Sequence, residues 1–233
     1  MSILKDINFD ILANICFRLS NNAIRNWHLG IVLEEPALLN HIIGQYRITE
    51  FGCNVGVSKI HIAKAKFYTL HRKGEKQIDK YGADLAVTIS SKNLSFSKTA
   101  FFQFKKSKKL KVIIEKKQID EAQKFPAVYD RSFVFVVDEV YKCIKIELLN
   151  NITKLVTGST ATFDCNEWKS QTEWLNLWLK CEIGEKSVFG STSSIEVILK
   201  DLTREEPKAI IPDKLDNFPN YLPAKEWMVF EID

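Results

Sequence analysis

The feature that most constrains the fold is a nearly continuous apolar run at residues 131–137, Arg-Ser-Phe-Val-Phe-Val-Val. A strand of this kind has no polar face to present to water, so it must be covered on both sides. Such strands occur in the interior of sheets that carry helices on both faces. The run therefore predicts an α/β fold with a covered central sheet.

Other strands are indicated on both sides of this run. Extended segments are expected around 60–70, at 82–90 and at 99–105, the last of which is the aromatic sequence Thr-Ala-Phe-Phe-Gln-Phe-Lys. A polar connection from Ser90 to Lys98 would let the second and third of these pair as an antiparallel hairpin. A further strand is predicted at 141–148. Together these segments predict a mixed sheet.

Helices are predicted between and around the strands. One is expected to begin at Pro36, because proline is favoured in the first helical turn. Another is expected from Lys117 to Phe125, where Pro126 interrupts it. A third lies within 168–179, where apolar residues at helical spacing indicate a side that packs on the core. These residues are Trp174, Leu175, Trp178 and Leu179.

The length of 233 residues fits one domain, and no linker or repeat divides the chain. We expect a core at about 30–140 and a C-terminal α/β elaboration at about 150–233. A hydrophobic content of 45% excludes a disordered chain. No apolar run approaches the roughly 18 residues that a membrane span needs, so no membrane association is expected.

The five cysteines are widely spaced and form no CxxC pair, which argues against a zinc site or a disulfide framework. Reduced thiols are typical of a cytoplasmic protein, and we expect that location. The net charge of +4 conceals an uneven distribution. Residues 92–117 hold nine lysines and one acid, Glu115, whereas residues 201–233 hold eight acids and four bases. Lysine-rich segments suit contact with a phosphate backbone better than base reading, although many such segments are only solvated surface.

The candidate chemistry lies in two short motifs, Gly82-Ala83-Asp84-Leu85 and Phe102-Gln103-Phe104-Lys105. Alternate side chains of a strand share a face, so Gln103 and Lys105 should point the same way while Phe102 and Phe104 enter the core. If Asp84 lies opposite them in the hairpin, three polar groups converge.

This pattern resembles the PD-(D/E)XK nuclease superfamily, in its Asp…Gln-x-Lys variant. The resemblance implies a restriction-endonuclease-like core, a mixed central sheet flanked by helices, over residues 30–140. It also implies Mg²⁺-dependent hydrolysis of phosphodiester bonds in DNA, with Mn²⁺ as the alternative cofactor. Asp84, Gln103, Lys105 and a helix glutamate, Glu35, would then be the catalytic residues. The amide of Gln103 replaces the usual acid, and it is a weaker metal ligand than a carboxylate.

The metal ligands implied by the resemblance are oxygen atoms, which hard cations prefer. They would come from Asp84, the Gln103 side chain, the Phe104 carbonyl and one of the two glutamates Glu34 and Glu35. On a helix, Glu35 shares a face with Leu38, Leu39 and Ile42, whereas Glu34 lies on a wetter face, which favours Glu35. Both acids would also be favoured at a helix N-terminus without any catalytic role.

Lys105 would orient the attacking water or stabilise the charged transition state, and the lysines that follow it would bind the DNA backbone. These are Lys106, Lys108, Lys109 and Lys111. The expected partner is double-stranded DNA, in a setting such as restriction or phage defence. Because an ungated nuclease is toxic, we also expect a homo-oligomer or a regulatory protein partner. The alternative is a catalytically inactive module on the same fold that binds nucleic acid or a partner protein.

Overall fold

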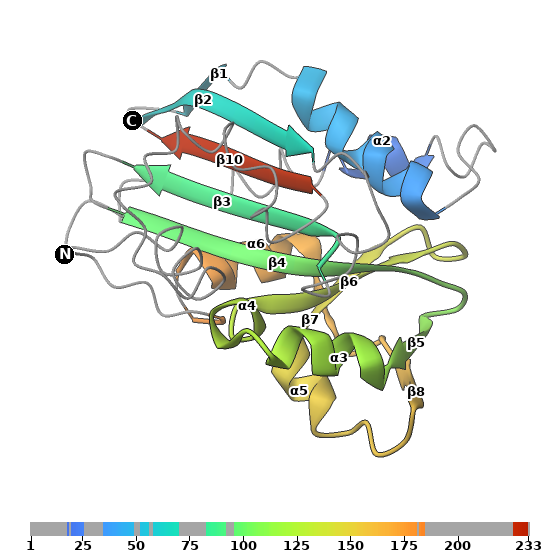
Figure 1. Ribbon diagram of the computed structural model, residues 1–233. Helices are drawn as coiled ribbons and strands as arrows, with labels where there is room; N and C mark the ends of the chain where they lie inside the picture. Colours follow the sequence, from blue (N-terminus) through green and yellow to red (C-terminus); the bar gives the residue numbers. More distant parts are fainter. Residues whose placement is uncertain are drawn as a thin grey trace.

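The computed structural model describes residues 18, 20–25, 35–48, 52–55, 58–69, 83–91, 96–180, 182–184 and 226–232. Within these residues an 8-stranded sheet has the order β1-β2-β10-β3-β4-β6-β7-β9 (Figure 1). Its strands are β1 (Gly52–Val55), β2 (Ser58–Thr69), β10 (Glu226–Ile232), β3 (Leu85–Ser91), β4 (Phe96–Ser107), β6 (Ser132–Asp138), β7 (Ile144–Leu148) and β9 (Lys169–Ser170). The pairs β10–β3 and β4–β6 are parallel and the others are antiparallel. The predicted mixed sheet is therefore confirmed.

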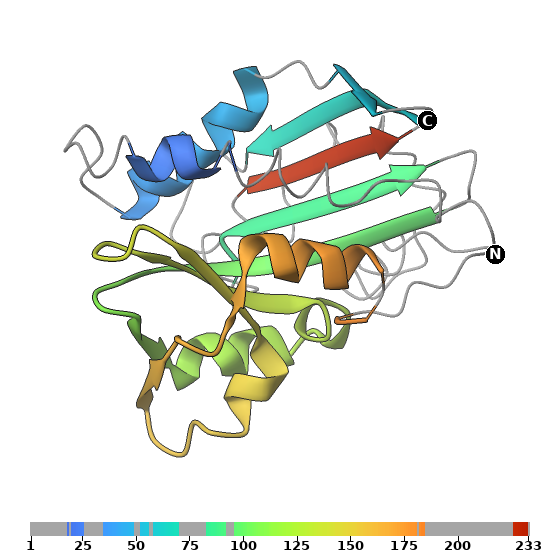
Figure 2. The ribbon, with the colours of Figure 1, turned by 180° about the vertical axis from the view of Figure 1, so that it is seen from behind.

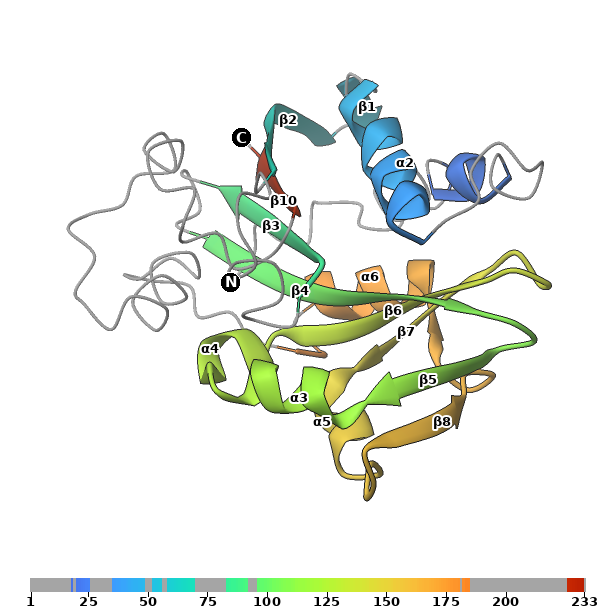
Figure 3. The ribbon, with the colours of Figure 1, turned by 45° about the vertical axis from the view of Figure 1, so that its right-hand side comes forward.

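Helices flank this sheet, as expected for an α/β fold. On one face, α2 (Glu35–Ile48) and α6 (Gln171–Leu179) contribute to the larger core cluster, and Figure 2 shows α6 lying across the strands. On the other face lie α3 (Lys116–Gln123), α4 (Pro126–Tyr129) and α5 (Leu149–Thr153). A separate antiparallel pair, β5 (Lys111–Glu115) and β8 (Thr160–Asp164), lies beside α3 and α5 (Figure 3).

β6 is the strand that the apolar run predicted, and all seven of its residues are buried. Its side chains alternate between the two cores. Phe133 and Phe135 pack on the α6 side, where the ring of Phe133 lies 5.2 Å from that of Trp174. Val134 and Val136 pack on the α3 side. Because both faces are filled with apolar side chains, the strand has no polar alternation to show in its sequence.

The predicted hairpin is confirmed: β3 and β4 pair antiparallel, with Leu85 opposite Phe102. The connection between them is shorter than expected, since β3 runs to Ser91 and β4 begins at Phe96. Lys98 is therefore a strand residue and is fully buried. Its ammonium group donates a hydrogen bond to the Trp178 carbonyl and lies 5.3 Å from the centre of that residue's ring. This pairing allows a lysine inside the sheet.

β10 comes from the part of the chain that was expected to elaborate the core, yet it lies inside the central sheet. It pairs antiparallel with β2 and parallel with β3, with Glu226 placed between Thr69 and Leu85. β10 thereby joins β2 to the remainder of the sheet. None of the described helices is both long and apolar enough to cross a membrane.

Candidate functional site

The carboxylate of Asp84 is bound to the strand that carries Gln103 and Lys105. Its Oδ2 accepts a hydrogen bond of 2.9 Å from the backbone N–H of Phe104. The backbone N–H of Asp84 donates in turn to the carbonyl of Phe102, at 2.8 Å. Asp84 immediately precedes Leu85, which pairs with Phe102, so it lies opposite the Gln103 position. The structure thus brings the aspartate of the first motif to the middle of the second.

β4 continues well beyond the point where β3 begins. Residues Gln103–Ser107 pair with β6, and no other described strand pairs with them. β3 begins at Leu85 and so has no residue that pairs with Phe104. The Phe104 N–H donates instead to the Asp84 carboxylate. A negatively charged group is therefore fixed at the start of the open part of β4, just before the half-buried Lys105.

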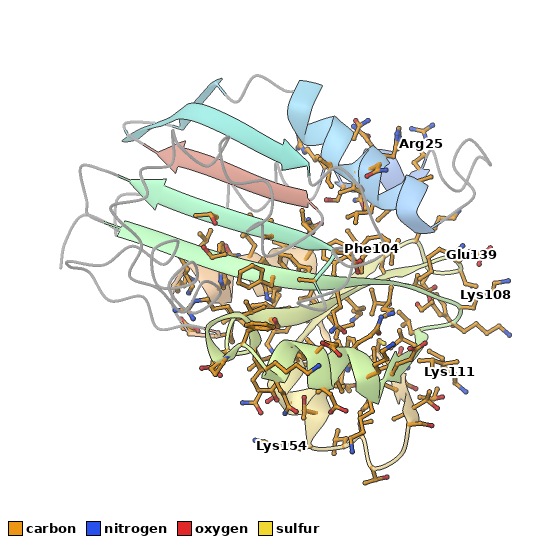
Figure 4. The ribbon with its side chains drawn as sticks, in the orientation of Figure 1. Arg25, Phe104, Lys108, Lys111, Glu139 and Lys154 are labelled. Atoms are coloured by element: carbon orange, nitrogen blue, oxygen red, sulfur yellow. The ribbon has the colours of Figure 1, made fainter. Side chains whose placement is uncertain are left out.

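Gln103 and Lys105 share the α3 side of the sheet, since their partners in β6 are Val134 and Val136. Phe102 and Phe104 point to the opposite core, where the ring of Phe104 stacks on that of Phe135 at 5.6 Å. Figure 4 shows Phe104 at this place in β4. The predicted alternation of apolar and polar residues along this strand therefore holds.

The amide group of Gln103 is buried, and its nitrogen alone has a hydrogen-bond partner among the described residues. Its Nε2 donates to the backbone carbonyl of Gln118 in α3, at 3.3 Å. A carbonyl can only accept, so this contact fixes which end of the amide is nitrogen. The Gln103 Oε1 has no hydrogen-bond partner among the described residues, and the same holds for the buried Oε1 of Gln118. Each of these oxygen atoms can accept a hydrogen bond or coordinate a cation.

The two candidate helix glutamates, Glu34 and Glu35, cannot be placed relative to Asp84 and Gln103. Glu35 is the first residue of α2, but its side chain lies outside the described part, as does the whole of Glu34. In the described part of the chain, no group of three or more His, Cys, Asp or Glu side chains is placed to hold a metal ion. Asp84 is therefore the one described carboxylate among the ligands that the sequence predicted.

The predicted DNA-binding lysines extend from the end of β4 into β5. Lys106 is half-buried, whereas Lys108, Lys109 and Lys111 are exposed. Lys108 lies 3.6 Å from Glu139, measured from Nζ to Oε2, and the Lys108 side chain is largely open to solvent while that of Glu139 is partly exposed. Such an exposed ion pair contributes little to stability and leaves both groups available. Figure 4 shows Lys108, Lys111 and Glu139 at the same end of the molecule.

Asp138 organises this end of the sheet, and the sequence reasoning did not identify it. The residue is fully buried, and each carboxylate oxygen accepts two hydrogen bonds. Oδ2 accepts from Ser107 Oγ and the Leu110 N–H, both at 2.6 Å. Oδ1 accepts from the N–H groups of Val140 and Tyr141, at 2.9 and 2.7 Å. Burial acts to raise the pKa of Asp138, but these hydrogen bonds outweigh it and lower the pKa. A clue lay in its position between two apolar runs, where Asp often bonds the backbone of a following turn.

Compared with protein-family models, with curated proteins and with solved structures, the chain matches none.

The described cysteines do not offer an alternative nucleophile. Cys143 and Cys165 are both free. Burial raises the pKa of Cys165 to about 12, so that thiol stays protonated near neutral pH. Burial and the neighbouring charge of Asp138 also raise the pKa of Cys143. Because the thiolate is the reactive form, neither residue has the character of a catalytic cysteine.

Proposed function

We propose that the protein is a metal-dependent nuclease that hydrolyses phosphodiester bonds in DNA. The observation that carries this proposal is the hydrogen bond from the Phe104 N–H to the Asp84 carboxylate. It fixes an acid beside the strand positions of Gln103 and Lys105, the arrangement that the Asp…Gln-x-Lys motif requires. The order of strands around it also supports a restriction-endonuclease-like core. An antiparallel hairpin, β3–β4, is followed by helix α3 and then by β6, which is parallel to β4.

The oxygen atoms that we propose as ligands are of the kind that a hard divalent cation such as Mg²⁺ or Mn²⁺ prefers. Asp84 provides a carboxylate, and the unpartnered Oε1 of Gln103 and that of Gln118 provide neutral oxygen donors. The Phe104 carbonyl and one of Glu34 and Glu35 complete the proposed set. A bound cation would neutralise the charge that accumulates on the phosphoryl oxygens during hydrolysis.

The remaining chemistry falls to residues of the chain itself. Water attacks the phosphorus atom and loses a proton to the solvent, while the bond from phosphorus to the leaving oxygen breaks and that oxygen takes up a proton. The ammonium group of Lys105 orients the water or stabilises the negative charge of the transition state. Asp84 is held still by the Phe104 N–H, so its charge is in place before substrate binds. Lys106, Lys108, Lys109 and Lys111 bind the backbone of the DNA on either side of the scissile bond.

A plasmid-cleavage assay tests this proposal. We expect nicking or linearisation with Mg²⁺ or Mn²⁺ and none in EDTA. Asp84→Asn and Lys105→Met should each lower the rate by about 10²- to 10³-fold, because each removes a preorganised charge. Asp130→Asn and Lys154→Met are matched controls at exposed positions and should retain full activity. Cleavage in EDTA, or full activity of the Asp84 and Lys105 variants, would refute the proposal.

A second candidate is an inactive module of the same fold that binds nucleic acid or a partner protein. It is favoured by the amide at position 103 and by the lack of a three-member acidic or His/Cys group in the described residues. Calorimetric titration with Mn²⁺ separates the two candidates. Binding that disappears in Asp84→Asn supports the nuclease, whereas DNA binding without metal binding or cleavage supports the module.

A further inference from the structure

Two tight turns lie side by side at the end of β4 and β6, and we call residues 107–110 and 138–143 the paired turns. In the first, Lys108 and Lys111 form a β-bridge, and the Lys111 N–H donates to the Lys108 carbonyl at 3.3 Å. Its two central residues, Lys109 and Leu110, have φ of 54° and 57°. Positive φ at both central residues is the mark of a type I′ turn, which closes a hairpin in two residues. In the second, the Asp138 N–H donates to the Cys143 carbonyl at 2.9 Å.

The positions with left-handed backbone conformation in these turns are occupied by lysine and leucine, and not by the usual glycine or asparagine. Lys109, Leu110 and Lys142 are the non-glycine residues with positive φ in the described part of the chain, and all three lie in the paired turns. Glycine and asparagine adopt this conformation more readily than lysine does. Leu110 is 7% exposed and packs in the core, which explains its presence. Lys109 and Lys142 are exposed, so packing does not explain them. Backbone strain of this sort is concentrated at functional positions.

The paired turns are held rigidly against each other. The carboxylate of Asp138 binds Ser107 and Leu110 in one turn, and Val140 and Tyr141 in the other. The Glu139 N–H adds a bond of 2.9 Å to the Ser107 carbonyl. The backbone that carries the exposed lysines is therefore already ordered, and less backbone conformational entropy is lost when these lysines bind a partner.

The surface of the paired turns carries several positive charges and one exposed aromatic side chain. Lys108, Lys109, Lys142 and the adjoining Lys111 are exposed, and Glu139 is the partly exposed acid among them. Tyr141 is 60% exposed and lies next to Lys142. Several ammonium groups carried by a hydrogen-bonded backbone, beside an aromatic side chain, match a phosphate backbone and its sugars.

We propose that the paired turns form a preorganised clamp for the backbone of duplex DNA, in which Lys109 and Lys142 bind phosphates and Tyr141 packs on a sugar. This proposal rests on the proposed nuclease function and identifies the surface that binds the substrate backbone. Lys109 follows Lys105 by four residues and lies in the turn that directly follows β4, so the clamp adjoins the proposed catalytic lysine. A rigid duplex matches a rigid clamp, whereas single strands are usually bound on rows of aromatic side chains.

The test measures binding of a fluorescent duplex of about 20 base pairs by anisotropy, in EDTA and from 50 to 200 mM salt, so that cleavage plays no part. Lys109→Asn and Lys142→Asn should each reduce the slope of log affinity against log salt by about 0.9, because each removes one phosphate contact. Tyr141→Ala should weaken binding without changing this slope. Lys109→Arg keeps the charge and should keep the slope of the parent protein. Lys154→Asn removes an exposed lysine at the end of α5 and should also leave the slope unchanged.

The stability of the variants shows whether a loss of binding is a loss of folding. Asparagine tolerates the left-handed conformation, so the urea midpoints of Lys109→Asn and Lys142→Asn should equal or exceed that of the parent protein. The clamp is overturned if these variants bind like Lys154→Asn, if no duplex binds, or if poly-glutamate of equal charge binds more tightly than the duplex. Cleavage by the parent with unchanged slopes in both variants would refute the clamp alone. Lysine-dependent binding without cleavage would refute the nuclease alone.

Discussion

A single buried carboxylate, that of Asp138, determines how the chain turns at the end of β4 and β6. All of its acceptor sites are used by donors of the protein. An amide in this position could not accept the same four bonds, because one of its ends is a donor.

We therefore expect Asp138→Asn to lower the free energy of unfolding by about 2–4 kcal/mol at neutral pH, since hydrogen bonds to a buried charge are lost. The pKa of Asp138 is lowered by folding, so the unfolded chain binds the proton more readily. Its contribution is thus complete above the unfolded pKa, near 3.8, and is lost as pH falls through the lower folded pKa.

Urea unfolding of the parent and of Asp138→Asn between pH 7 and pH 2 checks this prediction. The gap between the two proteins should be constant above about pH 5 and should narrow below about pH 4. Glu139→Gln, which alters an exposed acid next in sequence, serves as the control. A gap that stayed constant down to pH 2 would contradict the role given to the ionised carboxylate.

At the level of single residues, the sequence predicted what depends on strand periodicity. Gln103 and Lys105 share a face because alternate residues of a strand always do, and Asp84 lies opposite Gln103 because the hairpin pairs its two strands in that register. The sequence could not predict that the Gln103 amide would be buried with one oxygen unpaired, because this depends on how closely α3 packs on the sheet. Asp138 was missed for a similar reason, since its partners in the first turn lie about 30 residues away along the chain.

Among the elements, α6 shows how a local signal places a helix on the core. Ser170 precedes the helix, and its side chain accepts a hydrogen bond of 3.2 Å from the Glu173 N–H. This cap fixes where the first turn begins, and hence which side chains face the sheet. Trp174 then packs on Phe102 with their ring centres 5.1 Å apart.

Removal of this cap should destabilise the helix. We expect Ser170→Ala to lower the free energy of unfolding by about 1 kcal/mol, the usual effect of a lost N-cap. Thermal unfolding followed by circular dichroism measures it. Ser170→Thr should retain most of the stability, and Ser159→Ala, at an exposed loop position, is the matched control. Equal stability of Ser170→Ala and Ser159→Ala would show that the cap contributes nothing.

The elements that the sequence predicted are those with a strong local pattern. β6 was indicated by its apolar run, and α6 by the spacing of its tryptophans. β5 and β8 have alternating exposure and are short, and their pairing joins residues some 50 apart, so nothing local marks them as partners. The same limitation applies to the paired turns, whose type I′ turn is formed by Lys-Leu and not by the usual Asn-Gly.

For the molecule as a whole, β10 is the strand on which the continuity of the sheet depends. It is paired along both edges, with β2 on one side and with β3 on the other. No sequence pattern indicated this position, because a strand's neighbours are chosen by the entire fold and not by the strand alone.

Deletion of residues 226–233 should therefore separate β2 from the sheet and expose an unpaired edge of β3. We expect a lower urea midpoint, a broader transition and aggregation, since an open strand edge recruits other chains. A synthetic peptide of residues 224–233 added during refolding should restore part of the lost stability by adding the missing strand. A scrambled peptide is the control. Unfolding of the deleted chain at the same midpoint as the parent would show that the sheet does not depend on β10.

The position of β10 in the sequence also determines when the sheet can be completed during synthesis of the chain. β3 is synthesised about 140 residues before its partner, and at roughly 5–20 residues per second this interval lasts about 7–28 s. During that time the hairpin that carries Asp84 and Lys105 can form, but one of its edges has no partner. The hairpin is therefore formed early and completed late, because β10 can pair with β3 only after residue 232 has left the ribosome. Until then the open edge of β3 can recruit other chains.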